Sequence, residues 1–62
     1  MLIKLRKANE TGDDEGLVFV NTDQIVSISL AQSVTEIHLA DGRSLWVMDT
    51  PDQIAAMVKS SG

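Results

Sequence analysis

The chain has 62 residues, no cysteine, and nine acidic against five basic residues, for a formal net charge of −4. Its length predicts a single domain over residues 1–62, which buries only about 60% of its unfolded surface. The lack of cysteine excludes disulfides, and one histidine cannot build a Cys/His zinc site. We therefore expect association, as a homo-oligomer or with a larger protein partner, to stabilise the domain. A compact monomer is the alternative.

The distribution of charge and hydropathy limits the kinds of partner and the cellular compartment that we expect. Nucleic-acid binders cluster lysine and arginine on one surface, whereas only Lys4, Arg6 and Lys7 gather here. We therefore expect that nucleic acid is not the partner. Residues 1–7 lack the apolar core of a signal peptide, and no apolar run approaches the roughly 20 residues of a membrane helix. We expect a cytoplasmic protein without membrane insertion.

The first segment, residues 1–7, alternates apolar and polar side chains with the period of a half-buried strand. Its predicted core face carries Ile3 and Leu5. Residues 8–16 are rich in turn-forming and acidic residues and predict a solvated loop. Carboxylates are also calcium ligands, but their spacing here does not match an EF-hand loop.

A continuous apolar run, residues 17–20, predicts a strand buried on both faces. Asn21 or Thr22 can then cap a single helical turn, because short polar side chains bond nearby backbone N–H groups. Residues 25–30 resume the strand pattern, and residues 31–34 turn the chain. The predicted faces of this strand carry Val26, Ile28 and Leu30 on one side and Ser27 and Ser29 on the other.

The best-marked hairpin spans residues 35–47, with Ala40-Asp41-Gly42 at its turn. A three-residue turn keeps the apolar side chains of both strands on one face, whereas a two-residue turn mixes the faces. Gly42 would then adopt the left-handed conformation of a type I turn with a G1 bulge. The predicted pairs are Leu39 with Arg43, Ile37 with Leu45, and Thr35 with Val47. For the preceding strand they are Leu30 with Thr35, Ile28 with Ile37, and Val26 with Leu39.

The last segment predicts a helix, with Thr50 as N-cap, Pro51 at the first position and Gln53 completing a capping box. This helix ends near Ser60 and Gly62. Its apolar stripe consists of Ile54, Met57 and Val58. The predicted fold class is mainly β (α+β). It has about five short antiparallel strands, as a meander or small open barrel, with a short C-terminal helix.

The face opposite the predicted apolar one carries the residues with binding or chemical potential. It consists of Ser27, Ser29, Glu36, His38, Ser44 and Trp46. Glu36, His38 and Ser44 are the residue types of a hydrolase triad, but a flat sheet face supplies no oxyanion donors. We expect no enzyme, cofactor or metal site. Two placements of Trp46 remain open. It is buried within the protomer, or it is buried at an interface, where tryptophan is enriched among hot-spot residues. The candidate interaction surface is therefore Glu36, His38 and Trp46.

Several segments between residues 17 and 58 resemble the small flagellar FlbD-like family, also described through swarming-motility proteins. The matching pieces are Val20-Asn21-Thr22-Asp23-Gln24-Ile25 leading to Ile28, the strand with Thr35, Ile37 and Leu39, Asp41-Gly42-Arg43, and the helix start with Ile54 and Val58. The resemblance implies a non-enzymatic accessory protein of bacterial motility. It implies no catalytic residues.

These features predict a non-enzymatic interaction module that self-associates and is linked to flagellar motility. One alternative is a nucleic-acid-binding regulator that uses Lys4, Arg6 and Arg43, and another is a small structural protein. An enzyme would require a pocket around His38.

Overall fold

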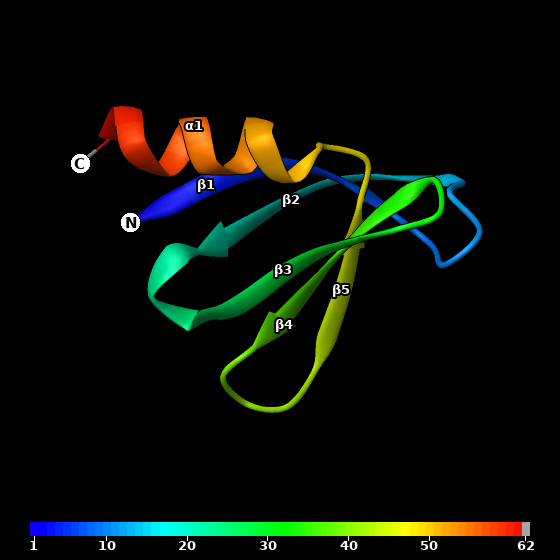
Figure 1. Cartoon of the computed structure of the whole chain (residues 1–62), viewed down its shortest axis with the longest axis horizontal. Coiled ribbons are helices and arrows are strands. Elements are labelled where there is room, and N and C mark those ends of the chain that lie inside the picture. Colours follow the sequence, from blue (N-terminus) through cyan, green and yellow to red (C-terminus); the bar gives the residue numbers. More distant parts are fainter. Residues whose placement is uncertain (62) are drawn as a thin grey trace.

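The computed structural model describes residues 1–61 and is mainly β (Figure 1). The strands are β1 (Leu2–Ala8), β2 (Asp14–Asn21), β3 (Ile25–Ala31), β4 (Val34–Leu39) and β5 (Ser44–Val47). A 3₁₀ turn, η1 (Thr22–Gln24), links β2 to β3, and the helix α1 (Pro51–Ser61) follows β5. Gly62, near which the helix was predicted to end, lies outside the described residues.

The five strands form one open antiparallel sheet in the order β2-β1-β5-β4-β3. This order combines the β1–β2 hairpin with the β3–β4–β5 meander. The two units join where Lys7 and Ala8 pair with Val47 and Trp46. The predicted fold class is confirmed. In this sheet β2 and β3 are the edge strands, so each pairs with only one neighbour.

The β4–β5 hairpin has the predicted register. Its pairs are Thr35–Val47, Glu36–Trp46, Ile37–Leu45 and His38–Ser44. The Leu39 N–H donates to Arg43 O at 2.9 Å, and the Gly42 N–H donates to Leu39 O at 3.0 Å. Gly42 has φ = 91°, a backbone conformation that glycine adopts without steric cost. The three-residue turn therefore keeps the apolar side chains of both strands together.

The register of β3 on β4 is confirmed in its second half and wrong at its start. The predicted pairs Ile28–Ile37 and Leu30–Thr35 are present. However, an irregularity after Ile25 places Ile25, rather than Val26, opposite Leu39. Val26 and Leu30 are 69% and 65% exposed. A bulge shifts the alternation of side chains, and an edge strand is covered by fewer neighbours.

The β1–β2 hairpin begins as predicted, with Ile3 and Leu5 buried. The predicted loop over residues 8–16 is too long, because Ala8 already pairs with Asp14. The connecting loop is therefore residues 9–13, and the strands extend further into the acidic segment.

The prediction that residues 17–20 are buried on both faces is wrong. Leu17 and Phe19 are each 64% exposed, whereas Val20 is buried. The physical reason is that nothing in residues 1–61 covers the outer face of the β1–β2 hairpin, where Leu2 on the interior strand β1 is also 65% exposed. A continuous apolar run therefore does not by itself establish burial within the protomer.

Both predicted caps form. Asn21 Oδ1 accepts the Asp23 N–H at 3.0 Å and caps η1. At the start of α1, the Gln53 N–H donates to Thr50 Oγ1 at 3.1 Å, and the Thr50 N–H donates to Gln53 Oε1 at 2.9 Å. This reciprocal capping box satisfies backbone donors that the first helical turn leaves without partners.

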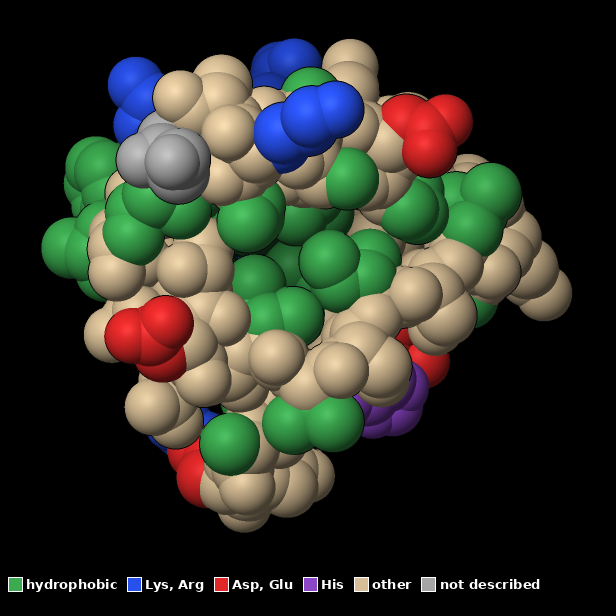
Figure 2. Space-filling view, turned by 60° about the vertical axis from the view of Figure 1, so that its left-hand side comes forward, with side chains coloured by type: hydrophobic (Ala, Val, Ile, Leu, Met, Phe, Trp, Pro, Cys, Tyr) green, Lys and Arg blue, Asp and Glu red, His purple; other side chains and the backbone are tan. Residues whose placement is uncertain are grey.

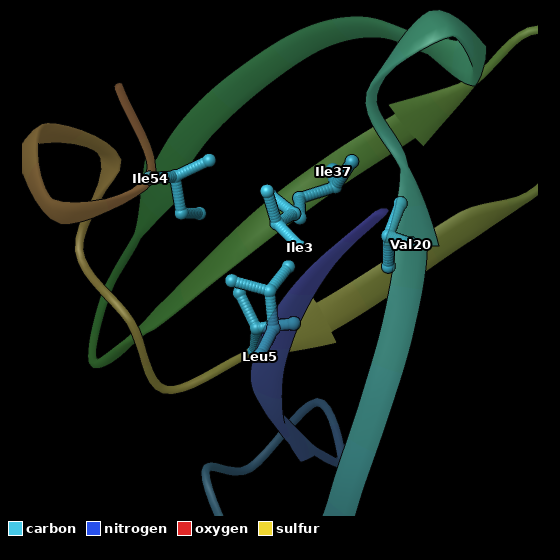
Figure 3. Close-up of a cluster of buried hydrophobic side chains, with 6 residues drawn as sticks. Ile3, Leu5, Val20, Ile37 and Ile54 are labelled. Atoms are coloured by element: carbon cyan, nitrogen blue, oxygen red, sulfur yellow. The ribbon is translucent and has the colours of Figure 1, made fainter. Parts of the chain in front are cut away.

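The sheet and α1 share one small core (Figure 3). Its buried cluster contains Ile3, Leu5, Val20, Ile37, Val47 and Ile54. Ile54 lies on the predicted helix stripe and is fully buried, whereas Val58 is 37% exposed. The first turns of α1 are therefore the part of the helix that the core holds.

Candidate interaction surfaces

The structure brings Glu36, His38 and Trp46 onto one face of the β4–β5 hairpin. Glu36 pairs with Trp46 across the hairpin. Residues two apart on a strand point to the same side, and His38 Nε2 accordingly lies 3.5 Å from Glu36 Oε1. The shared face was predicted correctly from side-chain parity. That this face binds a partner stays a prediction.

Ser44 extends this polar row, because its Oγ lies 3.4 Å from His38 Nδ1. A hydrolase also needs oxyanion donors and an enclosed place for its substrate. The cleft described below is lined by Ser44 but not by His38 or Glu36. The side chain of His38 is 47% exposed. The three residues therefore form a solvent-facing cross-strand polar cluster.

Trp46 is half-buried. Its ladder neighbours are the buried Ala8 on β1 and Glu36 on β4. Trp46 also lines the cleft described below. The protomer therefore covers part of Trp46 and leaves part of it accessible to a partner.

A cleft of about 760 Å³ separates β2 and the β1–β2 loop from the β4–β5 hairpin. Its apolar lining includes Val18, Val20, Leu39, Leu45 and Trp46. Val18, Leu39 and Leu45 pack against the core but are only partly buried. From the side of the N-terminus and η1, Figure 2 also shows hydrophobic side chains gathered around a hollow. The interior of this open sheet is therefore incompletely covered.

The charged side chains that line the cleft are largely neutralised by one another. Lys7 Nζ lies 3.7 Å from Glu15 Oε1, and Arg43 Nε lies 2.7 Å from Asp41 Oδ2. The Arg43 backbone N–H also donates to Asp41 Oδ1 at 3.0 Å. This backbone hydrogen bond, followed by the guanidinium hydrogen bond, lowers the pKa of Asp41 below its ordinary value. Pairing with Asp41 weakens Arg43 as an independent phosphate contact.

The outer face of the β1–β2 hairpin carries a second surface, the outer apolar patch, formed by Leu2, Leu17 and Phe19. These side chains are 65%, 64% and 64% exposed. In the ladder, Leu17 lies opposite Arg6 and Phe19 opposite Lys4, so two basic side chains border the patch. The apolar run in the sequence signalled this surface, but the run alone does not distinguish an interior strand from an exposed one.

The acidic β1–β2 loop is closed by its own hydrogen bonds. Asn9 Oδ1 accepts the backbone N–H groups of Thr11 and Asp13 at 3.0 and 2.8 Å. Asp13 Oδ2 in turn accepts from Asn9 Nδ2 at 3.2 Å. Within residues 1–61, no group of three or more histidine, aspartate or glutamate side chains is placed to hold a metal ion.

Comparisons with protein-family models, curated proteins and solved structures found no match. In the part of the chain that the structure describes, no helix has the length and apolar character needed to cross a membrane.

Proposed function

We propose that this protein is a non-enzymatic interaction module that self-associates through its β1–β2 hairpin. The observation that carries the proposal is the outer apolar patch, whose three large side chains are 64–65% exposed. Soluble monomers rarely combine contiguous apolar surface with an open strand edge, because each promotes contact with other chains. Burial against a second molecule would cover both the apolar surface and the open strand edge.

The size of the core supports the same proposal. In the described chain, eight apolar residues are buried. A chain of this length without disulfides gains stability when association adds to such a small core.

The FlbD-like resemblance extends the proposal to a cellular role, a cytoplasmic accessory protein of bacterial flagellar motility. In that role the protein contributes binding surfaces rather than chemistry. The face with Glu36, His38 and Trp46, together with the adjoining cleft, would receive a larger protein partner. Trp46 is the expected anchor, because a half-buried tryptophan offers a large contact area at little cost in side-chain entropy.

A small nucleic-acid-binding regulator is the second candidate, favoured by one observation. Lys4 and Arg6 are both exposed on the outer face of β1. Phosphate contacts would make the affinity fall steeply with salt, whereas apolar association is not weakened by salt. The salt dependence of binding therefore separates the two candidates.

Sedimentation velocity of the full chain, from roughly 10 µM to 1 mM, tests self-association over the range expected of weak dimers. We expect the weight-average sedimentation coefficient to rise with concentration, and Phe19→Ser to suppress the rise. Val26→Ser is the matched control, because Val26 is 69% exposed on the other edge strand. A strict monomer at the highest concentration would refute self-association. Binding of a labelled oligonucleotide at low salt would favour the second candidate instead.

A further inference from the structure

We propose that β2 pairs antiparallel with β2 of a second copy of this chain, about a two-fold axis at Phe19. This inference rests on the self-association proposed above and specifies its geometry. The pairing would join two five-stranded sheets edge to edge and bring the two outer apolar patches together.

The backbone of β2 alternates between groups bonded to β1 and groups directed at the free edge. The Thr22 N–H donates to Met1 O at 2.8 Å, directly beyond Leu2–Asn21, the last facing pair of the ladder. Bonded and non-bonded facing pairs alternate along an antiparallel ladder. Counting back from Thr22, Leu17 and Phe19 belong to non-bonded pairs. Their N–H and C=O groups therefore point away from β1.

The backbone hydrogen bonds of β1 independently indicate the same alternation. Arg6 faces Leu17 across the hairpin. Its backbone groups bond to the opposite side, because its C=O accepts the Met48 N–H at 2.8 Å and its N–H donates to Asp49 Oδ1 at 2.8 Å. Within the described residues, Leu17 and Phe19 thus present unpaired strand hydrogen-bonding groups at an open edge.

The regular part of this edge is short and symmetric about Phe19. At one end a bulge, in which Gly16 has φ = 92°, interrupts the ladder with β1. At the other end η1 begins. Residues 17–21 lie between, and Phe19 is their centre. A two-fold pair about that centre places Phe19 beside Phe19 of the second copy, and Leu17 beside Asn21 of the second copy.

The side chains of this stretch suit a second copy of the same strand. Val18 and Val20 belong to the core side, whereas Leu17 and Phe19 lie on the outer side. An added strand therefore meets apolar side chains on both faces. In the two-fold pair Phe19 faces Phe19, and Val18 faces Val20 of the second copy, so the centre of the contact is apolar on both faces. Leu17 faces the polar Asn21 at its ends.

The other edge strand is less suited to pairing. β3 has an irregularity after Ile25, and α1 packs against β3. Bulges and covering helices are the features that block edge-to-edge association in natural sheets. β2 also has a bulge, at Gly16, so the packing of α1 against β3 is the feature that distinguishes the two edges.

The expected dimer is weak. The outer apolar patch amounts to a few hundred Å² per copy, less than the roughly 800 Å² per partner of a standard interface. Each chain carries a formal charge of −4, and the two-fold pair brings Glu15 towards Asp23 of the second copy. We therefore expect a Kd on the order of 10–100 µM, which tightens as salt screens this repulsion.

Cysteine cross-linking tests the geometry, and the absence of native cysteine makes each introduced thiol unique. Facing residues of a hydrogen-bonded antiparallel pair have Cα atoms about 5.5 Å apart, within the range of a disulfide. We expect Phe19→Cys to form disulfide dimers at least ~10-fold faster than Val26→Cys under mild oxidation, since chance collisions alone set the control rate. Leu2→Cys is a second control, about three strand spacings from its symmetry mate and so out of reach.

The Phe19→Cys substitution removes a side chain from the centre of the contact and can itself weaken the dimer. A mixture of Leu17→Cys and Asn21→Cys proteins tests the same pairing with Phe19 intact. We expect this mixture to give heterodimeric disulfides in preference to either homodimer. If the wild type dimerises in sedimentation but these disulfides form no faster than in Val26→Cys, the β2 pairing is overturned and self-association stands. A wild type that stays monomeric overturns both. Faster cross-linking of Leu17→Cys alone than of the mixture also overturns the proposed register.

Discussion

Replacing Ile54 with alanine tests whether a single buried side chain holds α1 to the sheet. Among the helix residues whose side chains are described, Ile54 alone is buried, with none of its surface exposed. Truncations of this kind in a core cost about 2–5 kcal/mol. Alanine returns up to about 0.5 kcal/mol through its higher helix propensity. We expect a net loss of about 2–4 kcal/mol in the free energy of unfolding.

This loss is large for so small a domain. A chain of this length has a total stability of only about 3–9 kcal/mol, so much of the margin disappears. For a domain of this size, each kcal/mol corresponds to about 4–8 °C in Tm. We therefore expect Ile54→Ala to lower the Tm by about 10 °C or more.

Urea unfolding followed by Trp46 fluorescence and by far-ultraviolet circular dichroism measures the effect at two places in the molecule. Val58→Ala is the matched control, because it lies on the same helix, also gains helix propensity and is 37% exposed. We expect Val58→Ala to stay within about 0.5 kcal/mol of the wild type. Equal losses in the two variants would refute the idea that Ile54 anchors the helix. Separate transitions by the two probes would show instead that α1 undocks without the sheet.

Three further predictions concern the turn and the cap. Thr50→Ala removes one side of the capping box and should cost about 1 kcal/mol in thermal unfolding. Gly42→Ala should cost about 1–2 kcal/mol through its positive φ alone, because no atom lies within 4 Å of an added Cβ. For Asp41, whose folded pKa is lowered, the stability it contributes is full above the unfolded-state pKa and is lost as pH falls through the folded pKa. The stability difference between wild type and Asp41→Asn should therefore be constant above about pH 5 and shrink below about pH 4.

Each of these predictions has an outcome that contradicts it. If Thr50→Ser, which keeps the hydroxyl, loses as much stability as Thr50→Ala, the capping hydrogen bond is not the cause. Gly42→Asn tolerates the left-handed conformation better, so it should lose less than Gly42→Ala, and an equal loss would point to another contact. A stability difference for Asp41→Asn that persists unchanged at pH 2 would exclude the carboxylate as its source.

Most of the local structure could be predicted from the sequence. The register of the β4–β5 hairpin follows from the parity of Ile37 and Leu45 together with the need for glycine at position 42. The start of α1 follows from Thr50 and Gln53, whose side chains bond backbone groups only three residues away. The shared face of the candidate residues Glu36, His38 and Trp46 follows from the same parity.

Long-range placement could not be predicted in this way. The bulge after Ile25 moved Val26 out of its predicted register, and parity counts only regular ladders. The cleft was missed because its lining comes from the β1–β2 hairpin and from the β4–β5 hairpin, which are far apart in the sequence. Its formation depends on how the hairpin and the meander diverge from their short junction at Ala8 and Trp46.

The sequence by itself determined where the strands lie, the turn between β4 and β5, and the two caps. These features depend on interactions between residues that are close in the chain. Only the tertiary structure decided that β2 lies at an edge of the sheet. It also decided that the outer face of the β1–β2 hairpin has no covering layer in the described residues, which leaves Leu17 and Phe19, expected core residues, exposed. The burial of a side chain depends on the layer that covers it, and in the described residues no layer covers the outer face of β2.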